Sequence, residues 1–333
     1  MNNNLNFLDK RVTIDDINHF KSNGWVNIDL QIDDEIIDKT LKELKLVREK
    51  AISSKYKFGR VYYDHLFDFN LAAIELPFNK KICSNEVKIF FSKSKIGSII
   101  AAFFKTSEFS CELARLFCMG NYNYRGAWHR DQPASRNQEP NVIFDYGEKL
   151  EKLKALQIGI YLENQFGFRF LKKDYEEGFP YSIINKKIEK LNSELSYPIQ
   201  PNRHAYEKIG GERGSILIFD PQVYHQGSNQ KSRFDFHMRF QKTPVETKLK
   251  NPFQDFHVVS HLHEDISLDD AKIPTSIPKV KRQSTLSRII NTFNYYAPIF
   301  NVYKLSKRSN NFQEIKKFGT PDILANTYFQ RDV

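Results

Sequence analysis

The chain has 333 residues, of which 40% are hydrophobic, so it can bury a large core and wholesale disorder is excluded. Its formal net charge is +10, but the Lys and Arg residues are scattered, so we expect a solvated basic surface and no nucleic-acid partner. Three cysteines without metal-type spacing argue against a disulfide framework. We see no apolar leader and no apolar run long enough to span a membrane. We therefore expect a cytoplasmic protein.

The N-terminal part of the chain predicts helices and one strand. Thr13 and Asp16 form a capping-box start, and apolar residues follow at helical spacing until Gly24 ends the helix. Residues 25–30 alternate like a strand. Residues 33–50 carry apolar residues on one helical face and charge on the other, which predicts an amphipathic helix.

Strands dominate later in the chain. One more helix is predicted over 85–104, and strands are predicted over 111–122, 156–162, 215–219 and 233–241. In the last strand Phe, Phe, Met and Phe alternate with Asp, His and Arg, so one face is apolar and the other polar. Helices first, strands later and no βαβ rhythm predict a mainly β protein with flanking helices and antiparallel sheets.

We expect one domain over residues 1–250 and a basic C-terminal extension, helical in part, over 251–333. Within the domain, residues 172–208 are charged and broken by prolines, so we interpret them as an insert outside the core. Residues 284–307 show an amphipathic pattern. This segment can pack on the domain, lie on a membrane surface or contact a second copy of the chain.

The stretch AWHRDQ, residues 127–132, places His129 and Asp131 two residues apart. Such a pair can be two surface side chains, part of an acid–base pair or two ligands of a metal ion. His225, which follows the predicted strand at 215–219, is a third candidate ligand. Two imidazoles and one carboxylate on one face of a metal are typical of non-haem Fe(II) oxygenases, although zinc or another divalent ion can take the same ligands.

A cosubstrate anchor is the next requirement of such a site. A 2-oxo acid that supplies electrons chelates the metal at one end, and its far carboxylate needs a fixed cation, for which the arginine fork is suited. Arg233 follows His225 by eight residues and begins the last strand. On the strand at 156–162, Gln157 and Tyr161 share a face, where they either contact a cofactor or serve ordinary packing.

Four segments between residues 10 and 245 resemble the phytanoyl-CoA dioxygenase family of Fe(II)/2-oxoglutarate-dependent oxygenases. They are Ile17, Phe20 and Gly24-Trp25-Val26; the W-H-R-D-Q run at 128–132; Gly214–Phe219 leading to His225 and then Gly227-Ser228-Asn229; and Arg233 ahead of Arg239-Phe240. The resemblance implies a double-stranded β-helix, a cupin-like jelly roll, with N-terminal helices.

The resemblance also implies the ligands of the site. His129, Asp131 and His225 would bind Fe(II), while Arg233 and Ser228 would hold the C5 carboxylate of 2-oxoglutarate. The spacing from His225 to Arg233 is shorter than the family's, so Arg239 is the alternative anchor. The run FRFLKKDY at 168–175 stands where the family has a Pro-Gly-Ser-His run.

The expected function is that of an Fe(II)- and 2-oxoglutarate-dependent dioxygenase that uses O2 to hydroxylate a small metabolite, anionic or linked to lipid or sugar. Asp131 favours hydroxylation, because a halogenase of this type has a small residue in that place. Arg130 should point away from the metal and should be exposed unless it meets an anionic substrate. Residues 172–208 are the candidate lid, and 284–307 the candidate membrane contact. The alternative is a catalytically silent metal- or ligand-binding module on the same scaffold.

Overall fold

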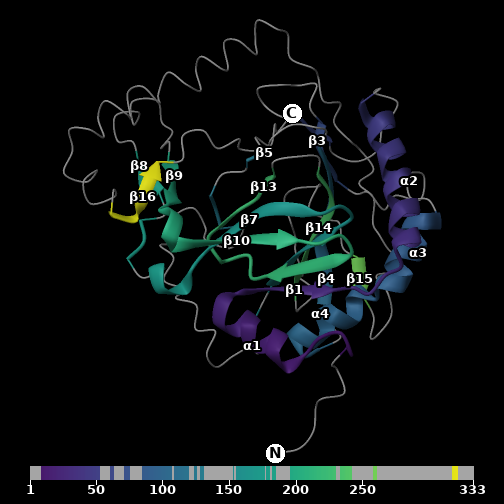
Figure 1. Ribbon diagram of the computed structural model, residues 1–333, viewed down its shortest axis with the longest axis horizontal. Helices are drawn as coiled ribbons and strands as arrows, with labels where there is room; N and C mark the ends of the chain where they lie inside the picture. The colour runs from purple at the N-terminus through teal and green to yellow at the C-terminus, as the bar shows by residue number, and fades with distance from the viewer. Residues whose placement is uncertain are drawn as a thin grey trace, which may run out of the picture.

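The computed structural model describes residues 9–52, 61–63, 71–75, 85–106, 109–119, 124–125, 128–130, 153, 155–176, 178–180, 182–184, 196–229, 233–241, 258–260 and 317–321. The described α-helices are α1 (Ile14–Asn23), α2 (Asp34–Ile52), α3 (Asn85–Ser94) and α4 (Ile96–Phe104). In Figure 1 they lie along the bottom and the right-hand side of the molecule.

Helix α1 begins and ends as its sequence predicts. The Thr13 hydroxyl accepts the Asp16 N–H at 3.1 Å, and the Asp16 carboxylate accepts the Thr13 N–H at 2.8 Å, which completes a capping box. At the other end Gly24 has φ 75° and donates its N–H to the carbonyl of Phe20 at 2.7 Å. A left-handed residue at this position favours glycine, and it turns the chain directly into the first strand.

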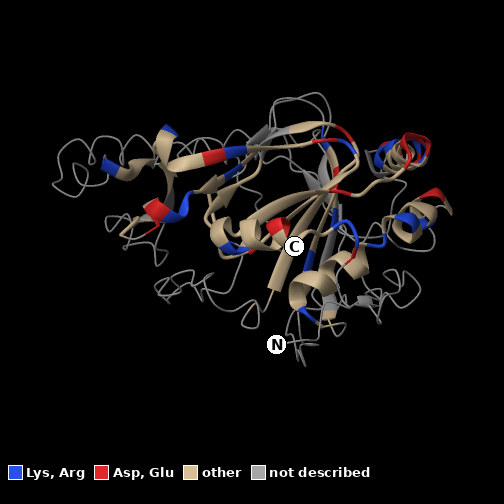
Figure 2. Cartoon of the chain, turned by 60° about the horizontal axis from the view of Figure 1, so that its bottom comes forward, with Lys and Arg blue, Asp and Glu red and all other residues tan. Residues whose placement is uncertain are grey.

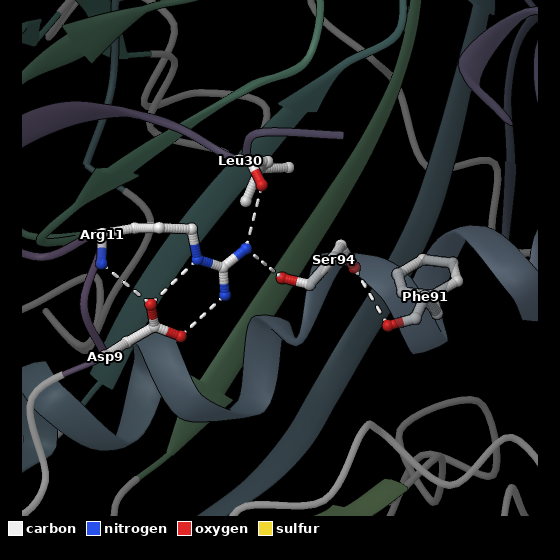
Figure 3. A network of polar contacts seen from close by, with 5 residues as sticks. All are labelled: Asp9, Arg11, Leu30, Phe91 and Ser94. Carbon is white, nitrogen blue, oxygen red and sulfur yellow. Dashed lines mark hydrogen bonds and ion pairs between the residues drawn. The ribbon is translucent and has the colours of Figure 1, made fainter. Parts of the chain in front are cut away.

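The single helix predicted over 85–104 is wrong in one respect, because the chain breaks at Lys95, where φ is 45°. The break coincides with a contact made by Arg11 (Figure 3). Its guanidinium donates to the carbonyls of Ser94 at 2.7 Å and Leu30 at 3.0 Å and is held by Asp9. The Ser94 carbonyl, which a continuous helix would use internally, is thus bonded to a distant arginine.

The larger sheet runs in the order β1-β11-β6-β14-β4-β3-β2, with β15 also paired to β4, and every pairing is antiparallel. Its strands are β1 (Trp25–Asp29), β2 (Val61–Tyr63), β3 (Leu71–Glu75), β4 (Phe109–Met119), β6 (Ala155–Tyr161), β11 (Ser215–Phe219), β14 (Arg233–Gln241) and β15 (Val258–Ser260). The strands predicted over 25–30, 111–122, 156–162, 215–219 and 233–241 are therefore confirmed within their described residues.

A smaller sheet faces the larger one. It contains β7 (Gln165–Leu171), β10 (Tyr206–Gly211) and β12 (His225–Gln226), in the order β10-β7-β12, and His129 forms an antiparallel bridge with His225 at its edge. The chain passes back and forth between the two sheets as it runs from β4 to β14. This topology is a double-stranded β-helix, so the predicted fold class is confirmed.

Both faces of the larger sheet carry buried apolar clusters. On β14, Phe234, Phe236, Met238 and Phe240 are buried in one cluster with residues of α1 to α4. On the other side of the same sheet, a second cluster joins it to the smaller sheet: Tyr161, Phe168, Phe170, Leu217, Phe219 and Val223. Strands buried on both faces are rich in apolar residues, as β6 and β11 are.

The expectation that 172–208 lies outside the core is wrong for its described residues. The segment includes 3₁₀ turns at Lys173–Tyr175 and Arg203–Ala205 and the strands β8 (Ser182–Ile184) and β9 (Ser196–Pro201). It contributes Phe179, Ile199, Ala205 and Tyr206 to a third buried cluster. Prolines and charges mark an irregular backbone, but the apolar residues between them still find a core.

Two described pieces of the C-terminal extension add strands to the domain. Besides β15, the strand β16 (Gly319–Pro321) pairs antiparallel with β9, and Figure 1 shows it beside β8 and β9. Phe318 packs against the third cluster. Residues 284–307, predicted as an amphipathic segment, lie outside the described residues.

The charged residues of α2 are mixed in sign. Lys39 pairs with Glu35 at 2.7 Å, and Arg213 reaches α2 at Asp34 (3.0 Å) and Asp38 (2.8 Å). Figure 2 shows basic and acidic residues side by side on the helices at the right, α2 and α3. Among the described helices, none combines the length and apolar character needed to cross a membrane.

Candidate metal and cosubstrate site

The two predicted histidine ligands face each other across the edge of the smaller sheet. His129 and His225 exchange both backbone hydrogen bonds at 2.9 Å, and their ring centroids lie 4.5 Å apart. An imidazole that binds a metal through one nitrogen has its centroid about 3.2 Å from the ion, so two imidazoles at a right angle have centroids about 4.5 Å apart. The observed spacing fits two ligands of one ion.

The backbone carbonyl of Val223 fixes the tautomer of His225. Its Nδ1 lies 2.7 Å from the carbonyl oxygen of Val223, which can only accept, so Nδ1 carries a proton and Nε2 keeps its lone pair. Hydrogen bonding at the far nitrogen is the usual way in which a ligating histidine is oriented. His225 is buried beside Phe168, Phe170 and Phe219, whereas His129 is exposed.

The third predicted ligand, Asp131, lies outside the described residues. Within the part of the chain that the structure covers, no three His, Cys, Asp or Glu side chains gather to hold an ion. The structure therefore brings together two of the three predicted ligands. Asp131 follows His129 by two residues, so its place as a ligand stays a prediction from the sequence.

Two stacked aromatic residues directly precede the two histidines in the sequence. Trp128, which precedes His129, stacks on Tyr224, which precedes His225, with ring centroids 5.4 Å apart and planes 25° apart. The Tyr224 hydroxyl donates to the carbonyl of Ile199 at 2.9 Å and accepts its N–H at 3.1 Å. The histidine-bearing segments are thereby tied to β9, in the segment interpreted as an insert.

Arg130 is not exposed, contrary to the prediction. Its Nη2 lies 3.6 Å from Oε1 of Glu176, and the two side chains are 13% and 12% exposed. Burial raises the pKa of Glu176 to about 8, while Arg130 and the backbone N–H of Tyr224 lower it. Glu176 was missed by the sequence reasoning, because nothing in its local pattern links it to a residue 46 positions earlier.

Arg233, the predicted cosubstrate anchor, is buried and is paired with Asp235. Nε and Nη2 of Arg233 donate to the two carboxylate oxygens of Asp235 at 2.5 and 3.0 Å. Burial raises the pKa of Asp235, and Arg233 opposes this rise. The guanidinium also lies 3.9 Å from the ring centroid of Phe117. The alternation of β14 does place Asp235 on the same face as Arg233, so the partner was visible in the pattern.

Phe168 lies between the arginine and the histidine. Its ring centroid is 6.0 Å from the Arg233 guanidinium carbon and 5.9 Å from the His225 ring, with which it is nearly parallel. A methyl group added to Gly227 would lie 3.5 Å from Nη1 of Arg233. The Nη1 side of the guanidinium thus faces the turn that leaves His225.

Arg239, the alternative anchor, contacts Gln157. Its Nε donates to Oε1 of Gln157 at 3.0 Å, so the Gln157 amide nitrogen donates to Nε2 of His237 at 2.5 Å. Gln157 and His237 are buried. The structure therefore places Gln157 with Arg239 and His237 on the inner face of β6 and β14, and separates it from the Arg233–Asp235 pair.

Tyr161 and Ser228 are the remaining predicted cofactor contacts. Tyr161 is buried in the cluster between the sheets, its ring lies directly against the backbone of Gly211, and burial raises its pKa above the usual range. Ser228 pairs with Arg125 through the short strands β13 (Ser228–Asn229) and β5 (Tyr124–Arg125). The side chain of Ser228 lies outside the description, so its predicted role stays a prediction.

Searches for relatives gave matches in structure alone. No family model matches the chain, and no curated protein does. Similar solved structures include EctD from S. alaskensis with 2-oxoglutarate and 5-hydroxyectoine, at 12% identity over 70% of this chain and 77% of that one, with a TM-score of 0.47. The α-ketoglutarate-dependent carbocyclase SnoK from nogalamycin biosynthesis matches at 8% identity over 70% and 85%, with a TM-score of 0.45. HygX from Streptomyces hygroscopicus with iron bound matches at 11% over 71% and 88%, with a TM-score of 0.43.

Proposed function

We propose that the protein is an Fe(II)- and 2-oxoglutarate-dependent dioxygenase that hydroxylates a small molecule. One observation carries the proposal: the rings of His129 and His225 have the spacing of two ligands of one metal ion, inside a double-stranded β-helix. The W-H-R-D-Q run adds Asp131 as the third ligand by its place in the sequence. Two histidines and a carboxylate are the ligand set of non-haem Fe(II) oxygenases.

Each group has residues to hold it. His129, His225 and Asp131 would bind the iron, and Arg233 would bind the far carboxylate of 2-oxoglutarate on its Nη1 side, with Asp235 on the other. When bound, the iron, 2-oxoglutarate and O2 together supply an oxidant strong enough to hydroxylate a carbon–hydrogen bond. Asp131 favours hydroxylation over halogenation, since it fills the ligand position that a halide would need.

The chain's own residues orient the reactants and exclude water. Val223 fixes the proton of His225 on Nδ1, so that the lone pair of Nε2 would be available to a metal ion. Phe168, Phe170 and Phe219 line the buried side of His225 with apolar surface, which keeps bulk water from a reactive oxidant. His129 is exposed, so the open side of the site faces the solvent from which a substrate arrives.

Binding and turnover test the proposal separately. Under anaerobic conditions, Fe(II) and 2-oxoglutarate added to the purified protein should give a visible charge-transfer absorbance that His225→Ala lacks. In air, the wild type should convert 2-oxoglutarate to succinate when the substrate is present, and slowly without it. A catalytically silent module would give the absorbance and no succinate with any substrate tried. Absence of both Fe(II) and 2-oxoglutarate binding in calorimetry would refute the proposal.

A further inference from the structure

One carboxylate touches the neighbours of both histidines. Glu176 accepts the backbone N–H of Tyr224, which precedes His225, and its Oε1 lies 3.6 Å from Nη2 of Arg130, which follows His129. Glu176 itself follows the 3₁₀ turn Lys173–Tyr175 in the segment 172–208. The two histidine-bearing strands come from regions 96 residues apart in the sequence, so their separation depends on contacts of this kind.

The contacts of Glu176 are buried and directional. Its side chain is 12% exposed, and that of Arg130 is 13% exposed. The backbone carbonyl of Glu176 also accepts the N–H of Phe179 at 3.2 Å, and Phe179 packs on Tyr224 with ring centroids 5.6 Å apart. Apolar contacts alone would hold these segments near each other, but hydrogen bonds and an ion pair also restrict their rotation.

A buried contact between an arginine and a glutamate adds little stability compared with apolar packing of the same volume. The contact between Glu176 and Arg130 is therefore better explained by a need to fix the positions of the two histidine-bearing segments than by a need for stability. Groups that orient metal ligands from outside the coordination shell commonly change metal affinity when they are replaced. Glu176 satisfies this description for His129 through Arg130, and for His225 through Tyr224.

We propose that Glu176 is a positioning residue that holds the segments of His129 and His225 at the separation a shared metal ion needs. The proposal rests on the proposed function, because it takes the two histidines as ligands. It gives the segment 172–208 a role in building the metal site that is separate from closing over it. In this proposal Glu176 acts through Arg130 and Tyr224 and is not itself a metal ligand.

The test compares Co²⁺ affinity with stability in three variants. Glu176→Ala removes both contacts and should weaken Co²⁺ binding about 10- to 100-fold. Glu176→Gln keeps an acceptor for Tyr224 and should recover part of that loss. Asp9→Asn is the matched control: it breaks the Asp9–Arg11 pair of Figure 3, which is similarly buried at 10% and 11% exposure and lies by α1. This control should lower the unfolding midpoint and leave Co²⁺ affinity unchanged.

The outcomes separate the proposal from its premise. If the wild type binds no Co²⁺, the proposed function fails with it. If the wild type binds and Glu176→Ala binds equally well, or loses no more affinity than Asp9→Asn does at the same loss of stability, Glu176 is not a positioning residue. Should Glu176→Ala fail to fold, Glu176→Gln and Arg130→Met replace it. A loss of Co²⁺ affinity in either, without a loss of stability beyond that of Asp9→Asn, supports the proposal, and unchanged affinity in both overturns it.

Discussion

The indole of Trp128 and the phenol of Tyr224 stack on each other one residue before each of the two facing histidines. The stack belongs to a buried cluster that includes Phe179, Ile199 and Tyr206. Because a packed aromatic pair is rigid, it fixes where the two strand segments emerge toward the site. The geometry of the two histidines therefore depends on the buried aromatic residues next to them in the sequence.

Tyr224→Phe should destabilise the protein by about 1–3 kcal/mol, because it leaves the N–H and carbonyl of Ile199 without their partner in a buried place. The measurement is urea unfolding followed by intrinsic fluorescence. Tyr175→Phe is the control, since Tyr175 is 37% exposed and its replacement should change stability by less than about 0.5 kcal/mol. Equal midpoints for Tyr224→Phe and the wild type would contradict the prediction.

The sequence predicted the parts of the fold that depend on local pattern. The alternation of β14 correctly separated its two faces. The apolar face, which includes Phe236, lies against the helices, and the polar face, which includes Asp235, lies toward the smaller sheet. The capping box at Thr13 and the left-handed Gly24 were visible for the same reason, since the residues that decide them are adjacent in the chain. Local rules of this kind fixed most of the strands.

Features that depend on distant residues were missed. The break at Lys95 accompanies the capture of the Ser94 carbonyl by Arg11, 83 residues earlier, and no local pattern announces it. Glu176 is one acidic residue among several in a charged stretch, and only the fold brings it to Arg130. The sequence pointed to the two histidines, to Arg233 and, through the alternation of β14, to Asp235. It did not point to the contacts that Glu176 and Tyr224 make.

Phe318→Ala should loosen the C-terminal strand from the insert. Phe318 is half-buried against Phe179, and its carbonyl accepts the N–H of Asn202 at 2.9 Å. Loss of the ring should destabilise this contact by about 1–2 kcal/mol, less than for a fully buried Phe. Hydrogen exchange at the Asn202 amide reports it and should quicken about 5- to 30-fold. Lys317→Ala, at an exposed position, should leave this exchange unchanged.

Asp235→Asn should tighten the binding of 2-oxoglutarate. Asp235 takes two donors of Arg233 and offsets its charge, so the neutral amide leaves the site more positive toward a dicarboxylate. We expect Kd to fall by about 3- to 10-fold, which corresponds to about 0.7–1.4 kcal/mol. Calorimetry with Ni²⁺-loaded protein measures it without turnover. An unchanged Kd would mean that Asp235 is already neutral in the wild type.

Replacing Arg233 and Asp235 together by Met and Asn removes the proposed anchor without leaving a lone buried charge. The double variant should bind 2-oxoglutarate at least about 30-fold more weakly, because it loses a charge-assisted contact of about 2 kcal/mol or more. Arg239→Met should have a smaller effect, since Arg239 is bonded to Gln157. The reverse order of effects would identify Arg239 as the anchor.

The stability of the protein should fall as the pH rises through the pKa of Glu176, which burial raises to about 8. A carboxyl with a higher pKa in the folded than in the unfolded state binds its proton more tightly when folded. Its contribution to stability is therefore complete below the unfolded pKa and is lost as the pH rises to about 8.

Unfolding free energies of the wild type and Glu176→Gln, measured from about pH 5 to about pH 9, isolate this contribution. The difference between them should change by up to about 1.4 kcal/mol per pH unit within the window, with the wild type losing stability relative to the variant. Asp9→Asn, in which Glu176 is intact, should keep the wild-type slope over this pH range. The pKa of Asp9 is lowered, so Asp9 titrates below the range. Parallel curves for the wild type and Glu176→Gln would show that the Glu176 carboxyl is ionised throughout, with Arg130 outweighing its burial.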